Sequence, residues 1–148
     1  MNSQGRKRRR GTYLLFFRYC LLFIISYLLF STAFTQCANP SPEQQAALAA
    51  EGYYRHLVAG QYEEFLEGRV GADSLPADYR EQLLAGCRQF MAQQQRVHQG
   101  IVGVTVSNAR TDSLSDYTSV FLLLNYGDST QEEIIVPMVN HNGRWQMR

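Results

Sequence analysis

The C-terminal third of the chain alternates hydrophobic and polar positions with the two-residue period of β-strands. Val102, Val104 and Val106 alternate with small or polar residues, whereas in the next strand residues 120–124 are apolar at successive positions. A strand that is apolar on both sides is typical of the middle of a structure. The pattern predicts a meander of four antiparallel strands over residues 100–148, joined by three tight turns.

Three local features refine this prediction of the sheet. Asn142-Gly143 readily takes positive φ angles and predicts a hairpin turn before a last short strand. Pro137 cannot donate a ladder hydrogen bond, so we expect a bulge or a sheet edge there. Trp145 in the last strand is expected to hold the C-terminus on the sheet.

Helical periodicity precedes the strands. The first helix is predicted from Pro42 to about Val58, with Ser41 as its cap. A short second helix is predicted over Gln61–Glu67, and a third begins at Pro76 and ends before Gly100. The apolar stripes predicted to face the core are Ala47, Ala50, Tyr54, Leu57 and Val58 on the first helix, and Leu83, Leu84, Cys87, Phe90, Met91 and Val97 on the third.

The order of helices followed by strands, without βαβ alternation, predicts an α+β fold with three N-terminal helices packed on a four-stranded antiparallel meander. Five side chains on facing elements are candidates for lining a cavity between helices and sheet, although a filled core is the commoner outcome. They are Tyr54, Phe90, Met91, Val120 and Leu122.

The opposite face of the sheet also carries apolar side chains, namely Phe121, Leu123 and Ile135. The predicted helices can cover one face of the sheet, and the other face needs a second cover. A partner subunit is the simplest cover for the other, so the sequence predicts a candidate homodimer face there.

Residues 1–36 form a basic, apolar leader. They hold six basic residues and no acid, and an apolar run extends over residues 19–34. Three interpretations stay open: a lipoprotein signal cut before Cys37, which would then carry the lipid; cleavage near Ala33–Ala38; or an uncleaved anchor. All three place residues 37–41 as linker and residues 42–148 as a folded domain outside the cytoplasm, in the cell envelope.

The three cysteines of the chain give little further indication of its location or chemistry. Cys20 lies in the apolar leader, and Cys37 and Cys87 could pair in an oxidising compartment if Cys37 carries no lipid. Their spacing does not resemble a metal site, so we expect no metal and no cofactor.

Charge is divided unevenly along the chain. After residue 36 there are eight Arg and thirteen Asp and Glu, which gives this part a net charge of −5. Nucleic-acid binding needs Lys or Arg to neutralise phosphates. The acidic domain therefore argues against a nucleic-acid partner.

The order of elements resembles the nuclear transport factor 2-like fold, in which a curved sheet wraps a long helix into a cone. The resemblance rests on Tyr53-Tyr54 before Ala59-Gly60-Gln61-Tyr62, on the long helix entering Gly100-Ile101, and on Val136-Pro137-Met138-Val139 followed by Asn142-Gly143-Arg144-Trp145. It covers residues 42–148 and is closest to small exported domains of unknown function in Gram-negative bacterial lipoproteins. The segment before Cys37 departs from the usual lipobox, with Phe34 and Gln36 at the positions that prefer Leu and a small residue.

Enzymes of this fold, such as ketosteroid isomerases and polyketide cyclases, place an acid or base inside the cone. The faces predicted to be buried carry almost no ionisable group, and Tyr54 and Tyr117 are the side chains that could point inward. We therefore assign no catalytic residue. We expect a non-catalytic, membrane-anchored module that binds a small apolar ligand or a protein, with an isomerase-like enzyme or a dimerising structural subunit as alternatives.

Overall fold

The computed structural model describes residues 17–22, 39–112 and 114–148. The chain divides into two units, Met1–Asn39 and Pro40–Arg148. The described residues of the first unit are 17–22, which are helical, and Asn39. No helix among the described residues has the length and apolar character needed to cross a membrane. The cleavage sites predicted in the leader, and Cys37 itself, lie outside the described residues.

Two helices begin the folded unit as the sequence predicts. Helix α2 spans Pro42–Val58, and Ser41 caps it through a complete capping box. The Ser41 hydroxyl accepts a hydrogen bond from the Gln44 backbone N–H, and the Gln44 side chain accepts one from the Ser41 N–H. This reciprocal pair satisfies two backbone donors at the start of the helix. Helix α3 follows at Tyr62–Glu67.

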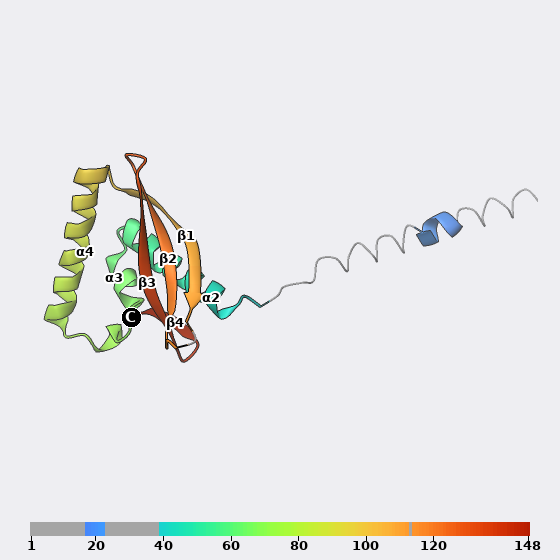
Figure 1. Cartoon of the computed structure of the whole chain (residues 1–148), viewed down its shortest axis with the longest axis horizontal. Helices are drawn as coiled ribbons and strands as arrows, with labels where there is room; N and C mark the ends of the chain where they lie inside the picture. The colour runs from blue at the N-terminus through green and yellow to red at the C-terminus, as the bar shows by residue number, and fades with distance from the viewer. Residues whose placement is uncertain (1–16, 23–38, 113) are drawn as a thin grey trace, which may run out of the picture. The chain divides into compact units, whose positions relative to one another are not determined.

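The strands form one antiparallel sheet in the order β1-β2-β3-β4 (Figure 1). Their bounds are Ile101–Thr111 for β1, Thr118–Tyr126 for β2, Gln131–His141 for β3 and Arg144–Met147 for β4. Both residues of the Asn142-Gly143 turn have positive φ, as predicted. The register is regular at Pro137, which lies where the pairing with β4 ends, so the edge interpretation was right and the bulge interpretation wrong. Two irregularities of register occur instead in β1, between Ile101 and Gly103 and between Val106 and Asn108.

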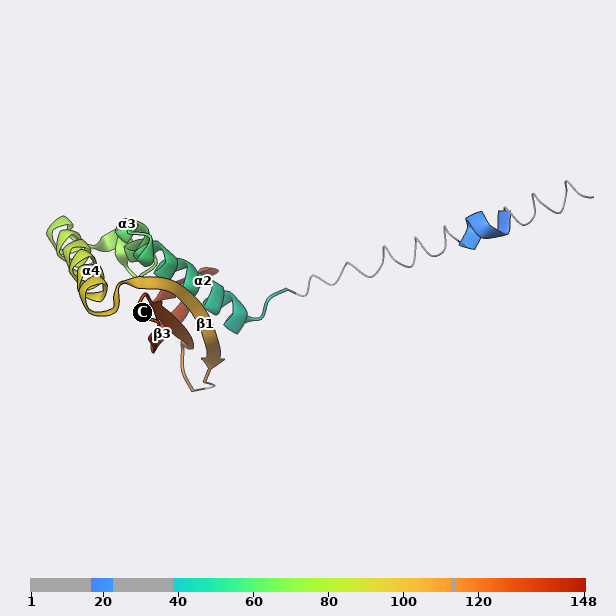
Figure 2. The same ribbon diagram turned by 90° about the horizontal axis from the view of Figure 1, so that it is seen from above.

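Helix α2 lies against one face of the sheet, called here the inner face. Its buried residues Ala46, Ala47 and Ala50 have small side chains, which let the helix approach the strands closely. Alternate residues of β2 are buried beneath it. Figure 2 shows β1 curving past α2, a bend to which the irregular pairing of β1 contributes. The close approach of α2 and the curve of β1 enclose one continuous core.

Every buried hydrophobic residue of the described chain lies within Pro40–Arg148. The described core therefore lies within this unit, and its roughly 110 residues are enough to close one core.

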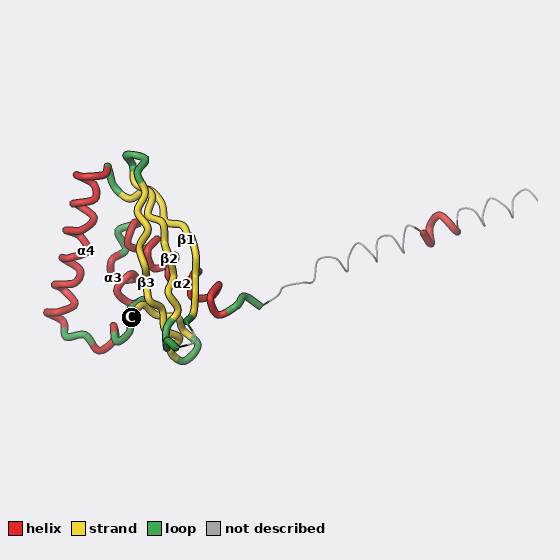
Figure 3. The backbone as a smooth tube through the Cα atoms, viewed as in Figure 1, coloured by secondary structure: helices red, strands yellow, loops and turns green. Residues whose placement is uncertain are grey.

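Helix α4, Ala77–His98, packs differently from the predicted core helix. Leu84 is its one buried residue, whereas Phe90 is 39% exposed and Val97 is 61% exposed. A short 3-10 turn, Ala72–Ser74, precedes it. The apolar stripe of α4 was thus wrongly interpreted as core along most of its length. In Figure 3 the strands form one sheet and α4 stands beside it. The α+β architecture of helices followed by a four-stranded antiparallel meander is confirmed.

Candidate functional site

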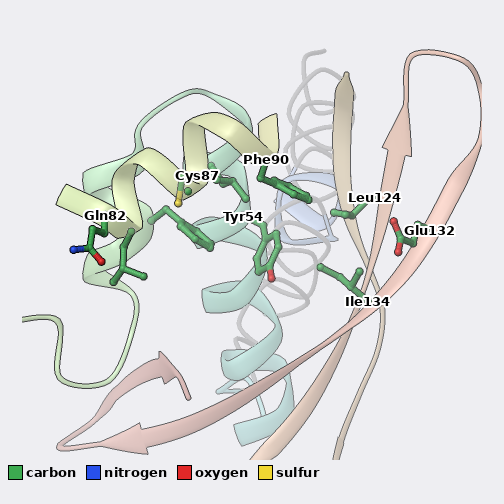
Figure 4. Close-up of a pocket in the computed structure, with 11 residues that line it drawn as sticks. Tyr54, Gln82, Cys87, Phe90, Leu124, Glu132 and Ile134 are labelled. Atoms are coloured by element: carbon green, nitrogen blue, oxygen red, sulfur yellow. The ribbon is translucent and has the colours of Figure 1, made fainter. Parts of the chain in front are cut away.

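The apolar stripe of α4 forms one wall of a pocket. The pocket has a volume of about 480 Å³, within the range of small-molecule sites. Helices α2, α3 and α4 and strands β2 and β3 all contribute to it (Figure 4). The lining residues are Tyr54, Leu57, Phe65, Gln82, Leu83, Gly86, Cys87, Phe90, Leu124, Glu132 and Ile134.

Three aromatic rings form the helical side of the pocket. Tyr54 of α2 and Phe65 of α3 pack edge to face, with ring centroids 5.4 Å apart. Phe90 of α4 lines the same space and keeps 39% of its surface exposed. An exposed Phe whose ring faces a cavity retains apolar surface that a ligand could cover. Burial raises the pKa of Tyr54, so its hydroxyl stays neutral.

Glu132 stands on the sheet side of the pocket beside two aliphatic residues. In the β2–β3 register Glu132 lies directly opposite Leu124, so both project from the inner face. Ile134 follows two residues later on the same face. Glu132 is the one charged side chain among the residues that line this pocket in the described chain. It places a carboxylate in an otherwise apolar site.

Tyr126 fixes the position of this carboxylate. The Tyr126 hydroxyl donates a hydrogen bond of 2.6 Å to Glu132 Oε2. Tyr126 is 5% exposed, and burial together with the bond to Glu132 raises its pKa to about 12. The hydroxyl therefore remains a donor at neutral pH. Hydrogen bonds to an ionised acceptor are short and strong, as this one is.

Backbone hydrogen bonds join the β2–β3 hairpin to the end of α4. The Gly127 N–H donates to the Gly100 carbonyl at 2.9 Å, and the Asp128 N–H donates to the His98 carbonyl at 3.1 Å. A Cβ at position 127 would lie 2.5 Å from the Gln99 carbonyl oxygen, so glycine is required for this approach. The contact fixes the C-terminal end of α4 against the sheet.

A second polar pair lies at this junction. His98 Nδ1 is 3.0 Å from Asp128 Oδ2, and the His98 ring lies on Tyr126 with centroids 4.6 Å apart. Hydrogen bonds from Thr130 and from His98 lower the pKa of Asp128 to about 2. Since Asp128 is ionised, it accepts and His98 Nδ1 carries the hydrogen. The His98 ring of this pair packs on Tyr126, and the Tyr126 hydroxyl in turn orients Glu132 through its hydrogen bond.

Helix α4 also contributes two small residues, Gly86 and Cys87, to the lining of the pocket. Gly86 is an exposed residue that lines the pocket, and a Cβ at this position would meet no atom within 4 Å. Cys87 also lines the pocket, and burial raises the pKa of its thiol. A protonated thiol is a weak nucleophile. Cys87 therefore serves as an apolar wall residue, and the disulfide suggested with Cys37 involves a residue outside the described chain.

The five predicted cavity residues separate into three groups. Tyr54 and Phe90 line the pocket. Met91 is half-buried and packs against the core. Val120 and Leu122 are 0% exposed within the core itself.

The predicted dimer face lies on the other side of the sheet. Phe121 pairs with Ile135 across β2 and β3, and Leu123 follows two residues later on the same face. Ile135 is 62% exposed, whereas Phe121 and Leu123 are half-buried. These three side chains form an apolar patch separated from the pocket by the sheet.

Sequence reasoning missed Glu132 and Tyr126. A usable signal existed for Glu132, because it precedes Ile134 by two residues and therefore shares its face. Tyr117, considered as an inward side chain, instead lies under the Arg148 guanidinium at 5.7 Å and does not line the pocket.

The arrangement offers an apolar volume, three aromatic rings and one oriented carboxylate. Such a site can bind the apolar part of a ligand, and its carboxylate can accept a hydrogen bond from the ligand or pair with a positive charge on it. In the described residues no three His, Cys, Asp or Glu side chains gather as metal ligands.

Comparisons with known proteins bear on the fold. No family model matches the sequence, and no curated protein matches it. Among solved structures, the chain is similar to a Campylobacter jejuni protein described as an NTF2-like transpeptidase, with a TM-score of 0.53 and 10% sequence identity. The match covers 66% of this chain and 92% of that one. Identity this low speaks for the fold alone, and the folded unit has the nuclear transport factor 2-like fold that the sequence resemblance implied.

Proposed function

We propose that the domain is a binding module that holds a small, mostly apolar molecule between α4 and the sheet. The observation that carries the proposal is the pocket of about 480 Å³, with apolar walls and a single carboxylate. A filled core would have buried Phe90, which instead stays 39% exposed. Ligand sites in proteins combine apolar walls with a few oriented polar groups in this way.

The chemistry named for the Campylobacter neighbour does not transfer easily to this pocket. Transpeptidation by a covalent route needs an activated nucleophile. Cys87 is the one thiol among the lining residues, and burial raises its pKa. Binding therefore explains the site with fewer assumptions than acyl transfer.

Filling the pocket tests the proposal. Gly86→Leu places a side chain in the open space at that position, whereas Ala85→Leu adds the same side chain at an exposed neighbour that does not line the pocket. The probe is Nile red, a neutral dye whose emission shifts in apolar surroundings. We measure its binding to residues 40–148, after confirming cooperative thermal unfolding of each variant.

The wild type and Ala85→Leu are expected to bind the dye equally, and Gly86→Leu to bind it about tenfold more weakly. Equal binding by all three would place the dye elsewhere and remove the support for this pocket as a ligand site.

A second candidate function is supported by Glu132. An inward carboxylate, hydrogen-bonded by Tyr126 in an open pocket, could accept a proton from a bound substrate as an isomerase or cyclase requires. The test is deuterium exchange next to the carbonyl of a cyclic ketone. Catalysed exchange that Glu132→Gln abolishes and Glu133→Gln retains would support an enzyme; exchange no faster than in buffer would exclude this reaction.

Self-association is the proposal for the outer sheet face. Phe121, Leu123 and Ile135 form an apolar patch there, and Ile135 is 62% exposed. Sedimentation of residues 40–148 should show a dimer that Ile135→Lys dissociates. A monomer at high concentration would end this proposal.

Export is the proposal for the leader. Six basic residues and an apolar run precede a domain of net charge −5, as in a protein delivered outward across a membrane and held in the envelope. Mass spectrometry of the N-terminus from the native host would distinguish lipid on Cys37, cleavage near Ala33–Ala38 and an intact anchor. Full-length protein recovered free in the cytosol would contradict export.

A further inference from the structure

We propose that the pocket selects an organic cation, a molecule with an alkylated ammonium group on an apolar body. The inference rests on the proposed binding function and names its ligand class. It depends on two independent features of the pocket, the aromatic rings and the charge of the lining.

The rings provide faces suited to a cation. Tyr54 and Phe65 meet edge to face at 5.4 Å, and Phe90 lines the same space from α4. Each aromatic ring has a negative face that attracts a cation within about 6 Å of its centroid. Figure 4 shows the side chains of Tyr54 and Phe90 directed into the pocket. Rings from three different helices thus surround one apolar volume.

The charge of the lining has the matching sign. Glu132 alone is charged among the lining residues described, and it projects from the sheet side. Tyr126 donates a 2.6 Å hydrogen bond to one of its oxygens, Oε2. The other oxygen, Oε1, has no protein partner among the described residues and is available to a ligand.

The surroundings favour a cation over an anion. Asp128 adds a second negative charge behind Tyr126. Arg69, an exposed residue, lines a smaller adjoining cavity with Tyr54 and Phe65, and it is not among the residues that line this pocket. An anionic ligand would meet the like charge of the exposed Glu132 carboxylate, and the lining residues hold no cation to compensate it.

The experiment compares two probes of nearly equal shape. Benzyltrimethylammonium carries the cation, and neopentylbenzene replaces its nitrogen with carbon and is neutral. Binding of each to residues 40–148 is followed by NMR chemical-shift titration. The affinity of the neutral probe reports the apolar contribution to binding, and the difference in affinity between the two probes reports the contribution of the positive charge.

Two substitutions separate the contributions. Glu132→Gln keeps the shape of the side chain and removes its charge, whereas Glu133→Gln makes the same change at the neighbour on the opposite face. Phe90→Leu keeps apolar volume and removes a ring. We expect Glu132→Gln to weaken the cation about fivefold, and Phe90→Leu about threefold. Both substitutions should change the dissociation constant of the neutral probe by no more than about twofold, because each removes little apolar contact. Glu133→Gln should leave the dissociation constants of both probes unchanged.

The outcomes distinguish this inference from the proposed function. If the neutral probe binds and Glu132→Gln affects both probes equally, or neither, the cation inference is overturned and the binding function stands. If neither probe binds the wild type, both are overturned. If Glu133→Gln weakens the cation as much as Glu132→Gln, the effect belongs to the net charge of the domain, and the inference fails.

Discussion

Truncating Phe90 and Leu122 to alanine should cost very different amounts of stability. Leu122 is 0% exposed beneath α2, and its loss removes apolar burial and leaves a cavity, so Leu122→Ala should cost about 3–5 kcal/mol. Phe90 is 39% exposed and faces open space. Its loss removes only part of a full burial and creates no enclosed void, so Phe90→Ala should cost about 1–2 kcal/mol. Truncating Phe90, the larger side chain, should therefore cost less stability than truncating Leu122.

Urea denaturation of residues 40–148 measures both changes, with the slope against denaturant checked for constancy. Leu84→Ala provides the control on α4, because Leu84 is 4% exposed and its loss should cost roughly 2–5 kcal/mol. A Phe90→Ala cost equal to that of Leu122→Ala would mean that α4 closes on the sheet in solution. That result would refute the pocket.

Three further predictions concern α4 and the polar junction. Gly86→Ala and Gly52→Ala both replace a glycine inside a helix with nothing within 4 Å of the new Cβ, so each should stabilise by about 0.5–1 kcal/mol in thermal unfolding; destabilisation by Gly86→Ala alone would show that its surroundings are filled. Hydrogen bonds, first from Thr130, lower the pKa of Asp128 from 3.8 to about 2, so the stability it contributes is present above pH 3.8 and is lost as pH falls toward 2. Asp128→Asn should flatten that part of the acid unfolding curve, and an unchanged curve would contradict the assignment. Tyr126 should titrate at about pH 12 in absorbance at 295 nm, and the stability it contributes should be present below pH 10 and lost as pH rises through 12. Tyr126→Phe should remove this late titration step, and a step of unchanged size would assign it to another tyrosine.

Local signals predicted the elements well. Ser41, Pro42 and Gln44 define the start of α2 through short-range hydrogen bonds, which a sequence displays directly. The Asn142-Gly143 turn is equally local. Such features depend on neighbours along the chain, so the sequence alone was sufficient to locate them.

The position of α4 depended on long-range packing. Phe90 and Val97 lie at helical spacing with Leu84, and periodicity shows only that they share a face. It cannot show whether that face meets a filled core or a pocket. The hairpin contact at Gly127 fixes one end of α4, and no sequence pattern indicates that contact.

The polar part of the site was partly visible. Glu132 shares the inner face with Ile134 and Val136 by simple alternation, so attention to strand parity would have found it. The pairing of His98 with Asp128 joins residues 30 positions apart. Only the folded arrangement of α4 and the β2–β3 hairpin reveals that pair.

The most direct test of the account is an NMR structure of residues 40–148 with bound neopentylbenzene. If the probe occupies the pocket, intermolecular nuclear Overhauser effects are expected from it to the ring protons of Phe90 and Tyr54 and to the methyl groups of Leu124 and Ile134. Contacts confined to the outer face of the sheet, around Phe121 and Ile135, would contradict the claim that the space beside α4 is the ligand site.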